Sequence, residues 1–419
     1  MTLSATGAQD CDVLIIGGGP AGSTAATLLA RDGYDVVLLE KDAHPRFHIG
    51  ESLLPCNLPL LRDLGVLEQV QAMGVYKPGA EFVSDRDDRR VPFPFRYAIA
   101  AKEDHAYQVV RSQFDELLFR NAAKHGARTF ENTHALSVDF HERQRAVVTV
   151  RNAEGKEQIW TPRFVLDASG REGFLGRKLR RRNADRNNST AAIFSHFRNV
   201  PRRDGDMGGY ISIHLVDQGW FWMIPLPDGV MSVGFVGDKP AFQNHSGSVA
   251  DLFWKKVKES PAVASRMANA EALSELSTTG NYSYRADKAW GDGYYLIGDA
   301  YAFLDPVFSS GVLLAMRSAY RGAKVTRAWL QSPELGAKTA AAAERETCAE
   351  MRRVSWLIYR INNPVLRKLF LNPRNILRMR DAIISLLAGD FSGKLRVMAP
   401  FATFKAIYAL LSLKKEPLQ

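Results

Sequence analysis

Apolar positions near the start of the chain fall into two short runs. The first, residues 13–16, leads into a Gly-x-Gly-x-x-Gly turn and then an alanine-rich stretch over residues 23–31. The second, residues 35–39, ends at Glu40. An apolar run followed by spaced glycines and a helical stretch predicts the strand, turn and helix that open a dinucleotide-binding unit.

The three glycines of this turn have separate roles in such a unit. Gly17 allows the tight turn, Gly19 lets a diphosphate approach the backbone, and Gly22 lets the helix pack closely on the strand. The diphosphate then lies on N–H groups at the positive end of the helix. Glu40 is placed to accept hydrogen bonds from an adenosine ribose. The alternative is a tight turn in an α/β protein without a nucleotide.

Strand and helix patterns continue along the chain. Residues 81–107 and 191–236 alternate apolar with polar or aromatic positions, which predicts half-buried strands of one mixed sheet. Helical patterns are expected in a stretch ending near Gly74, after a loop within residues 300–329, over residues 336–353, and in a tail punctuated by Pro364, Pro373 and Pro400.

Composition narrows the class of protein. The chain has 419 residues and a formal net charge of +10, with ordinary apolar and charged fractions. Its three cysteines are scattered, without metal-ligand spacing or a disulfide framework. No signal peptide is visible, and no uncharged apolar run approaches the roughly 20 residues that span a bilayer. We therefore expect a cytoplasmic protein without a metal.

The excess positive charge is concentrated near the end of the chain. Residues 351–419 contain thirteen Lys or Arg against three Asp or Glu, an excess equal to the whole net charge of +10. Phe401, Phe404, Tyr408 and Leu411 recur at helical spacing, which predicts an amphipathic helix. This helix either packs on its own domain or docks on an acidic carrier protein or an anionic membrane. Nucleic acid is not expected, since no recognised motif accompanies the charge.

Three further motifs indicate that the nucleotide is FAD. Gly298-Asp299 follows an apolar strand, residues 165–170 form another strand with a small-residue turn, and Arg111 lies within Val-Val-Arg-Ser-Gln-Phe-Asp at residues 109–115. Together these motifs resemble those of the flavoprotein monooxygenases, reductases and halogenases. The resemblance implies that Asp299 contacts the ribityl and phosphate part of FAD and that Arg111 contacts the flavin. Other cofactor-binding residues implied by it are Arg46, Pro306 and Gly311.

The expected fold class is α/β, with a Rossmann-type FAD-binding domain, a mixed β-sheet substrate domain and a helical C-terminal region. The FAD-binding domain is discontinuous and comprises residues 8–75, 100–175 and 283–335. The substrate-side sheet comprises residues 76–99 and 176–282. The basic helical region comprises residues 336–419.

Two tryptophans on one expected strand separate the branches of this superfamily. Trp220-x-Trp222-x-Ile224-Pro225 resembles the signature of flavin-dependent halogenases, and residues 46–55 resemble their Phe-His-Ile-Gly-Glu-Ser segment. On this resemblance, the two indoles form a wall that keeps the flavin apart from the organic substrate. The alternative is that they simply pack within a sheet.

Lys77 is the residue to which the resemblance assigns halogen transfer. Its context at residues 76–82 resembles the stretch around the catalytic lysine of phenol- and pyrrole-type halogenases. The family implies that hypohalous acid made at FADH2 reaches this lysine, which delivers the halogen by hydrogen bond or as a haloamine. An ammonium group suits the first route, and a desolvated amine of lowered pKa suits the second. The alternative is an exposed surface lysine.

Residues 306–311 resemble the halide-binding turn of the same family. The match implies that the amides of Ser310 and Gly311 hold chloride or bromide, as N–H groups before a helix can do. Tryptophan-type members have a glutamate where Phe308 stands, so the substrate is expected to be a phenol or pyrrole, which needs less help in losing a proton. In relatives that do not halogenate, a similar turn simply closes over the flavin.

We therefore predict an FADH2-dependent halogenase of an electron-rich aromatic ring, free or bound to an acidic acyl carrier protein. A separate flavin reductase is expected, since the chain shows no second nucleotide fingerprint for NAD(P)H. The rival enzyme is an FAD-dependent monooxygenase or a double-bond reductase acting on a lipid or polyketide. From a different class, the chain is a flavin-bearing docking protein whose basic tail is the active part.

Overall fold

The computed structural model describes residues 8–85, 89–99, 102–140, 145–179, 182–243 and 247–413. The helices up to residue 178 are α1 (Pro20–Arg31), α2 (Leu58–Asp63), α3 (Leu67–Met73), α4 (Arg111–Lys124) and α5 (Phe174–Lys178). The later helices are α6 (Lys239–Phe242), α7 (Val249–Lys258), α8 (Pro261–Met267), α9 (Gly311–Gln331), α10 (Pro333–Ile358), α11 (Pro364–Leu371), α12 (Met379–Leu387) and α13 (Leu395–Leu413). Short 3₁₀ helices are η1 (Pro55–Asn57), η2 (Phe95–Tyr97), η3 (Gly170–Glu172), η4 (Gly205–Gly209), η5 (Gly298–Ala300), η6 (Pro306–Phe308) and η7 (Ile376–Arg378).

The first sheet has eight strands, most of them parallel, in the order β17-β18-β10-β1-β2-β7, with β8 and β9 attached beside β10. Its strands are β1 (Gln9–Ile16), β2 (Val36–Leu39), β7 (Arg128–Phe130), β8 (His134–Asp139), β9 (Val147–Arg151), β10 (Glu157–Asp167), β17 (Trp290–Gly291) and β18 (Tyr294–Leu296). β1 pairs in parallel with β2 and β10. The unbroken apolar run at residues 13–16 is buried because helices α1, α4 and α9 cover the sheet around it.

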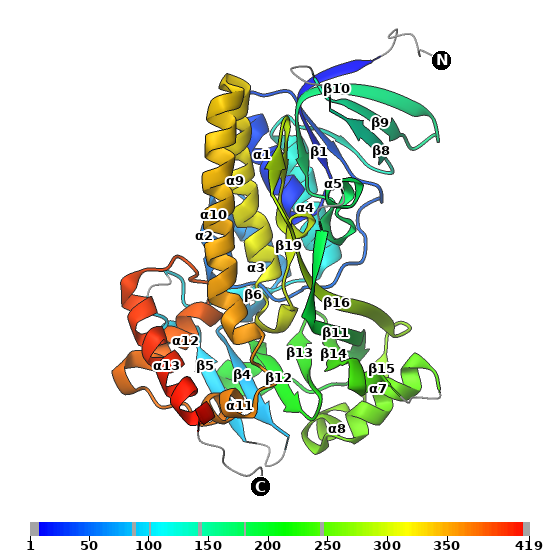
Figure 1. Ribbon diagram of the computed structural model, residues 1–419. Coiled ribbons are helices and arrows are strands. Elements are labelled where there is room, and N and C mark those ends of the chain that lie inside the picture. Colours follow the sequence, from blue (N-terminus) through cyan, green and yellow to red (C-terminus); the bar gives the residue numbers. More distant parts are fainter. Residues whose placement is uncertain are drawn as a thin grey trace.

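The second sheet has nine strands in the order β19-β16-β11-β14-β13-β12-β4-β5, with β15 attached to β11. Its strands are β4 (Gly79–Ser84), β5 (Arg90–Pro94), β11 (Arg182–Arg198), β12 (Ile211–Val216), β13 (Gly219–Pro225), β14 (Met231–Asp238), β15 (Glu271–Ala272), β16 (Ser277–Ala286) and β19 (Ala302–Phe303). β4 and β12 are parallel and the other pairs antiparallel, so the expected mixed sheet is present. Figure 1 shows it below the first sheet, with α9 and α10 along one side of the molecule.

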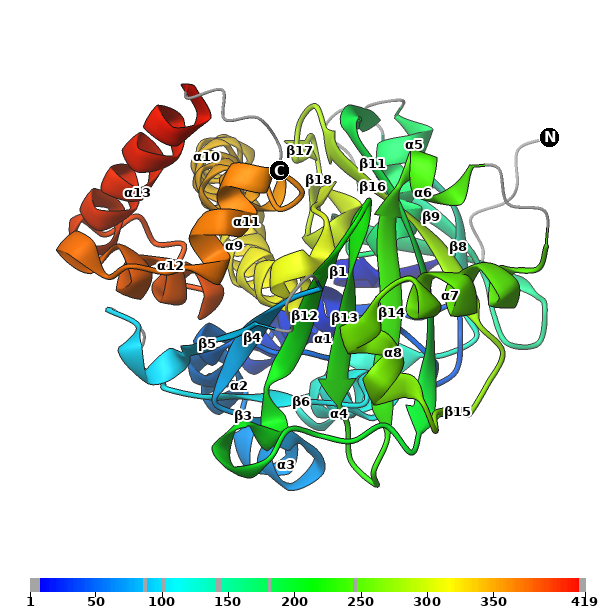
Figure 2. The same cartoon turned by 90° about the horizontal axis from the view of Figure 1, so that it is seen from below.

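Alternation along β13 directs neighbouring side chains to opposite faces of the second sheet. Trp220, Trp222 and Ile224 belong to a core shared with α11, α12 and α13. Phe221 and Met223 belong to a separate core closed by α7 and α8. Figure 2 shows these helices on opposite sides of the strands. The spacing Trp-x-Trp therefore places both indoles on one face.

One expected strand lies elsewhere. Residues 106–108 form β6 (Ala106–Gln108), which pairs with β3 (Val75–Lys77) in a separate two-stranded ribbon instead of joining the large sheet. A bridge between Ser52 and Gln108 continues this ribbon toward the loop that precedes α2. β19 pairs with β16 of the second sheet, although the expected division assigned residues 302–303 to the FAD-binding domain. The domain boundaries remain a proposal.

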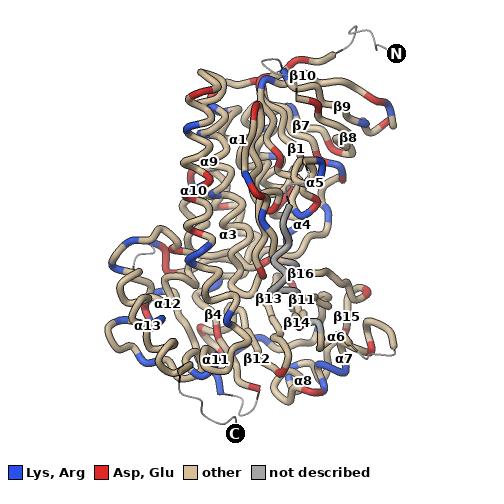
Figure 3. The backbone as a smooth tube through the Cα atoms, viewed as in Figure 1, with Lys and Arg blue, Asp and Glu red and all other residues tan. Residues whose placement is uncertain are grey.

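The C-terminal tail is helical, and its aromatic stripe packs inward. Phe401 and Phe404 are buried, and with Tyr408 they surround the ring of Trp356 at centroid distances of 5.2–6.3 Å. Pro400 lies inside α13, where it removes one i→i−4 hydrogen bond without ending the helix. The stripe therefore packs on its own domain up to Tyr408, while Leu411 is exposed. Lys and Arg positions are spread along the tail helices, as the blue segments in Figure 3 show.

By length and composition, α13 alone among the described helices meets the criteria for crossing a membrane. Arg396 and Lys405 interrupt its apolar sequence. A single helix of this kind is weak evidence for a membrane span.

Candidate active site

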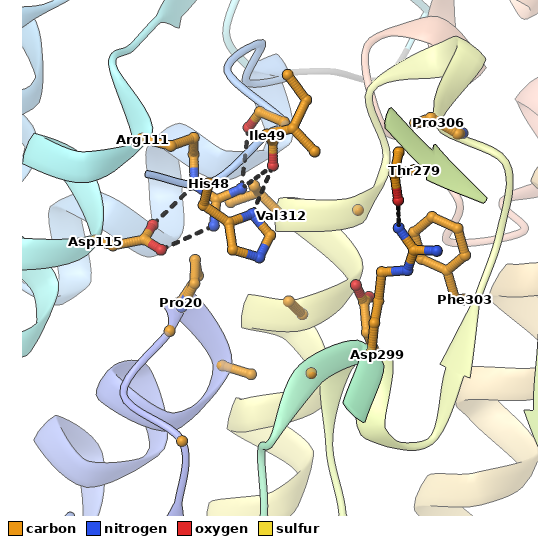
Figure 4. Close-up of a pocket in the computed structure, with 18 of the residues that line it drawn as sticks. Pro20, His48, Ile49, Arg111, Asp115, Thr279, Asp299, Phe303, Pro306 and Val312 are labelled. Atoms are coloured by element: carbon orange, nitrogen blue, oxygen red, sulfur yellow. Dashed lines mark hydrogen bonds and ion pairs between the residues drawn. The ribbon is translucent and has the colours of Figure 1, made fainter. Parts of the chain in front are cut away.

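A cavity of about 530 Å³ lies between the two sheets, in the size range of small-molecule and cofactor sites. Its wall collects residues that are far apart in the sequence, from the first turn to the start of α9. Figure 4 shows part of this wall. The predicted site residues that line it are Gly17, Gly19, Glu40, Arg46, Arg111, Trp220, Trp222, Asp299, Pro306 and Gly311. Three other predicted site residues do not line the cavity: Gly22, Lys77 and Ser310.

The glycine turn opens one end of the cavity. A Cβ added at Gly22 would lie 1.9 Å from the carbonyl oxygen of Gly17, so only glycine allows α1 to approach β1 this closely. At Gly19 the nearest atom to an added Cβ is 3.7 Å away, which leaves the backbone accessible from the cavity. Gly19 also precedes the first residue of α1. This arrangement suits a diphosphate at the positive end of a helix.

Glu40 at the end of β2 is the centre of a buried charge network. Its carboxylate accepts hydrogen bonds from the backbone of Gly18 at 2.9 Å and of Asp42 at 3.1 Å. Arg46 pairs with it at 3.0 Å and reaches Asp115 at 3.4 Å. Glu40 is thus held in place as a hydrogen-bond acceptor, as recognition of a ribose hydroxyl requires.

Arg111 lines the cavity, and its guanidinium is bound to other protein groups. Its guanidinium forms two parallel hydrogen bonds to Asp115, at 2.8 and 2.9 Å, and donates to the carbonyl oxygens of Ile49 and Gly50. Burial raises the pKa of Asp115, but the charge and hydrogen bonds of Arg111 outweigh it, so the net pKa is lowered. Arg111 therefore fixes the loop over residues 46–50 against α4, as the dashed lines in Figure 4 show.

Sequence reasoning did not single out His48, whose ring lies in the cavity. Arg111 and then burial lower its pKa to about 4, which keeps the imidazole neutral. Arg171 was missed as well: it lines the cavity, donates to Thr279 at 2.6 Å and lies over the ring of Phe303. His48 lies within the noted segment at residues 46–55, and Arg171 directly follows the noted motif at residues 165–170. Only the fold shows which way their side chains turn.

The tryptophan pair lines the cavity with both rings buried. The ring centroids of Trp220 and Trp222 are 6.0 Å apart, and Trp222 donates from Nε1 to the hydroxyl of Ser232 at 3.1 Å. A Cβ at Gly234 would lie 2.3 Å from the Trp222 ring, so this glycine leaves room for the indole. The two indoles therefore form one continuous aromatic surface beside the cavity.

The turn before α9 forms a further part of the cavity wall. Asp305 caps η6 and accepts from Thr190 at 3.0 Å, and burial raises its pKa to about 6. Ser309 takes a left-handed conformation with φ of 55°, and Ser310 then caps the 21-residue helix α9. Gly311 lines the cavity. A long helix thus directs its positive end at the site, where an anion is stabilised.

Lys77 at the end of β3 is 1% exposed. Its ammonium nitrogen donates to the hydroxyl of Ser52 at 2.7 Å and to the carbonyl oxygen of Leu53 at 2.8 Å, and lies 5.2 Å from the ring centre of Phe95. Burial lowers the pKa of Lys77 to about 7. Ser52 lines the cavity, so one hydroxyl separates this amine from the cofactor space. A surface lysine, the alternative considered above, is wrong.

The lowered pKa of Lys77 predicts a dependence of stability on pH. Between about pH 7 and about pH 10 the unfolded chain binds a proton that the folded chain does not, so the free energy of unfolding rises with pH. We expect a contribution approaching 1.4 kcal/mol per pH unit. Lys77→Met should lack it. Denaturant unfolding of both proteins across this range measures the difference, and parallel curves would contradict the expectation.

The lining of the cavity suits FAD chemically. Its wall combines an accessible glycine turn, a ribose acceptor and an aromatic surface. Beside that surface, Phe82 packs edge to face on Phe93, Phe308 and Phe370, while Phe308 stacks on Phe370 and Phe93 lies tilted to it, with ring centroids 4.8–6.4 Å apart. These rings close the core between β4 and α11.

Comparison with known proteins agrees with this geometry. Residues 10–332 match the FAD binding domain family. The chain is 36% identical over 312 residues to a tryptophan 2-halogenase of Chondromyces crocatus, covering 73% of this chain and 59% of that protein. It is 34% identical over 334 residues to the 1H-pyrrole-2-carbonyl-[peptidyl-carrier protein] chlorinase of Pseudomonas fluorescens, covering 74% of each. A flavoprotein/dehydrogenase from Cytophaga hutchinsonii superposes with a TM-score of 0.87 at 28% identity, covering 97% of this chain and 100% of that one.

The cofactor and the fold expected from the motifs are thereby confirmed. The matched region spans less than two thirds of the tryptophan 2-halogenase but almost three quarters of the pyrrole chlorinase. The chain is an FAD-dependent oxidoreductase and belongs to the family of flavin-dependent halogenases.

Proposed function

We propose that the protein halogenates an electron-rich aromatic ring, with Lys77 transferring the halogen. The observation that carries this proposal is a buried amine of lowered pKa, one hydroxyl away from the FAD cavity. Burying a lysine without a carboxylate partner is energetically costly, so such a lysine beside a cofactor site indicates a role in catalysis.

Reduced FAD, when bound, supplies the electrons by which oxygen and halide become hypohalous acid and water. The indoles of Trp220 and Trp222 shield the ring of an organic substrate from direct contact with the cofactor. Near neutral pH the lowered pKa makes Lys77 available both as an ammonium and as a neutral amine. The ammonium can hold hypohalous acid by hydrogen bond, and the neutral amine can take the halogen with loss of water. The substrate ring then gains the halogen and loses a proton.

For the halide, we propose the amides of Ser310 and Gly311 at the start of α9. The positive end of this helix and the glycine on the cavity wall support the assignment. The buried ring of Phe308 bears on the substrate, because position 308 then has no carboxylate to help remove a ring proton. We therefore propose a phenol or pyrrole. The names of the two relatives above give different substrates, tryptophan and a pyrrole. The choice of a phenol or pyrrole for this protein therefore rests on Phe308.

We further propose that a separate reductase supplies FADH2, that the protein is cytoplasmic, and that its substrate is either free or bound to an acyl carrier protein. The name of the pyrrole chlorinase supports a carrier-bound substrate. Membrane contact through the tail has less support, because Phe401 and Phe404 of the predicted docking stripe are buried.

Turnover of purified protein tests the proposal. With FADH2, oxygen, bromide and a simple phenol, we expect a monobrominated product detected by mass spectrometry. The likeness to a flavoprotein/dehydrogenase favours reduction of a double bond as the second candidate. A hydroxylated phenol, or saturation of an added alkene without oxygen or halide, would replace the first proposal by an oxygenase or a reductase.

A further inference from the structure

Glu51 places a buried carboxylate on the wall of the FAD cavity that the proposed function does not use. Its backbone is held by a hydrogen bond from Val109 at 2.8 Å, beside the bridge from Ser52 to Gln108. Successive side chains of an extended segment point to opposite sides. Ser52 therefore reaches Lys77, while Glu51 reaches β11 of the second sheet.

One oxygen of Glu51 has a partner and the other does not. Oε1 lies 2.5 Å from Nε2 of His196. Oε2 is buried and has no hydrogen-bond partner among the described residues. Glu51 is 1% exposed, and a buried polar oxygen without a hydrogen-bond partner is unfavourable. Oε2 can therefore accept a hydrogen bond from a bound group.

The hydrogen bond to His196 orients Glu51. Burial lowers the pKa of His196, but the hydrogen bond and charge of Glu51 outweigh it, so the net pKa is raised. The backbone of His196 pairs with Ser232, and its ring packs against Phe47, which also stacks on Phe194. The imidazole is thus fixed by the sheet on one side and by the cavity loop on the other.

A group that donates to Oε2 of Glu51 would lie at the aromatic end of the cavity. Phe194, two residues before His196 on the same strand, lines the cavity, and its ring is 5.8 Å from that of Trp222. The nucleotide turn and Glu40 define the opposite end. The ring system of FAD is therefore the part that reaches Glu51. Reduction adds hydrogen to its ring nitrogens, which turns acceptors into donors.

We propose that Glu51 binds the cofactor by accepting, through Oε2, a hydrogen bond from a ring N–H that only reduced FAD carries, and that His196 is its positioning residue. The site then prefers FADH2 to FAD, which suits an enzyme that receives reduced flavin from a partner and releases the oxidised form. This inference rests on the proposed function only in taking FADH2 as the working form.

Glu51→Gln tests the preference, because the amide can still accept from His196 but presents a donor where Oε2 was. Binding is measured anaerobically by titration with FAD and with FADH2, without halide or aromatic substrate. We expect FADH2 to bind about tenfold more weakly and FAD to bind nearly unchanged, as for loss of one hydrogen bond to a charged acceptor. The midpoint potential of the bound flavin should fall by about 30 mV, the equivalent of a tenfold change for two electrons.

Two further variants separate this role from a structural one. Glu157 lies away from the cavity wall, is 58% exposed and is paired with Arg151, so Glu157→Gln should leave both affinities unchanged. His196→Gln should weaken FADH2 binding in the same direction, and it stands in for Glu51→Gln if that variant does not fold. Equal losses for FAD and FADH2, or no loss, would overturn the proposal. Because no halogenation is measured, this result is independent of whether the enzyme halogenates.

Discussion

Replacing Lys77 with methionine should reduce halogenation by more than about a hundredfold while FAD still binds, the scale expected when a positioned proton-transfer or nucleophilic group is removed. Methionine fills nearly the same buried volume but offers no amine to hold the oxidant. Because the cavity wall is formed by Ser52 and not by Lys77, the cofactor site should remain intact. Brominated phenol is measured by mass spectrometry, and oxidant that escapes is measured with a thiol trap.

The two readouts separate halogen transfer from oxidant formation. In Lys77→Met we expect oxidant to reach the trap while the brominated ring disappears. Lys41→Met is the matched control, because Lys41 also borders the cavity but is 42% exposed and paired with Glu172, and it should keep near-normal activity. Lys77→Met protein that still brominates at more than half the normal rate would exclude the lysine from the reaction.

Gly22→Ala should abolish FAD binding and lower the free energy of unfolding by more than about 3 kcal/mol, a large effect for one substitution. The added Cβ would lie 1.9 Å from the carbonyl oxygen of Gly17 and 3.2 Å from the Cβ of Ala168, neither of which is the end of a flexible side chain. Helix α1 would have to move away from β1, which carries the turn that holds the diphosphate. Thermal unfolding and the fluorescence of added FAD measure the two effects.

Gly19→Ala separates folding from binding in the same turn. Its Cβ would meet no atom closer than 3.7 Å, so the protein should unfold normally. The same methyl group would occupy the approach of the diphosphate, and we expect FAD to bind at least a hundredfold more weakly, about 2.7 kcal/mol. Normal FAD binding by Gly19→Ala would show that the diphosphate lies elsewhere.

The local motifs were readable because each depends on neighbours in the sequence. The turn from Gly17 to Gly22 requires glycine whatever the rest of the fold does, since the constraint is steric and local. The i, i+2 spacing of Trp220 and Trp222 puts both rings on one face of any strand. The fold class and the FAD cofactor could be predicted because these motifs also resemble those of a known flavoprotein family, and both are confirmed. The roles of Lys77, Trp220, Trp222, Ser310 and Gly311 stay predictions.

Contacts between distant segments could not be read in this way. The sequence shows Lys77 beside Pro78 and Gly79, but not the Ser52 hydroxyl that it meets or the burial that lowers its pKa. The same holds for Glu51 and His196, which are 145 positions apart. In the tail, periodicity alone allowed both docking and internal packing, and only the position of Trp356 decided for Phe401 and Phe404.

The sequence by itself therefore determined the nucleotide-binding turn and the shared face of the two indoles, because steric limits and strand periodicity act over a few residues. The type of cofactor followed from the resemblance of its motifs to those of a flavoprotein family. The tertiary structure alone decided which charges lie in the cavity, that the Lys77 amine is desolvated, and that one oxygen of Glu51 lacks a partner. These properties depend on dielectric surroundings and on hydrogen bonds across the two sheets, and both arise only when distant segments pack together.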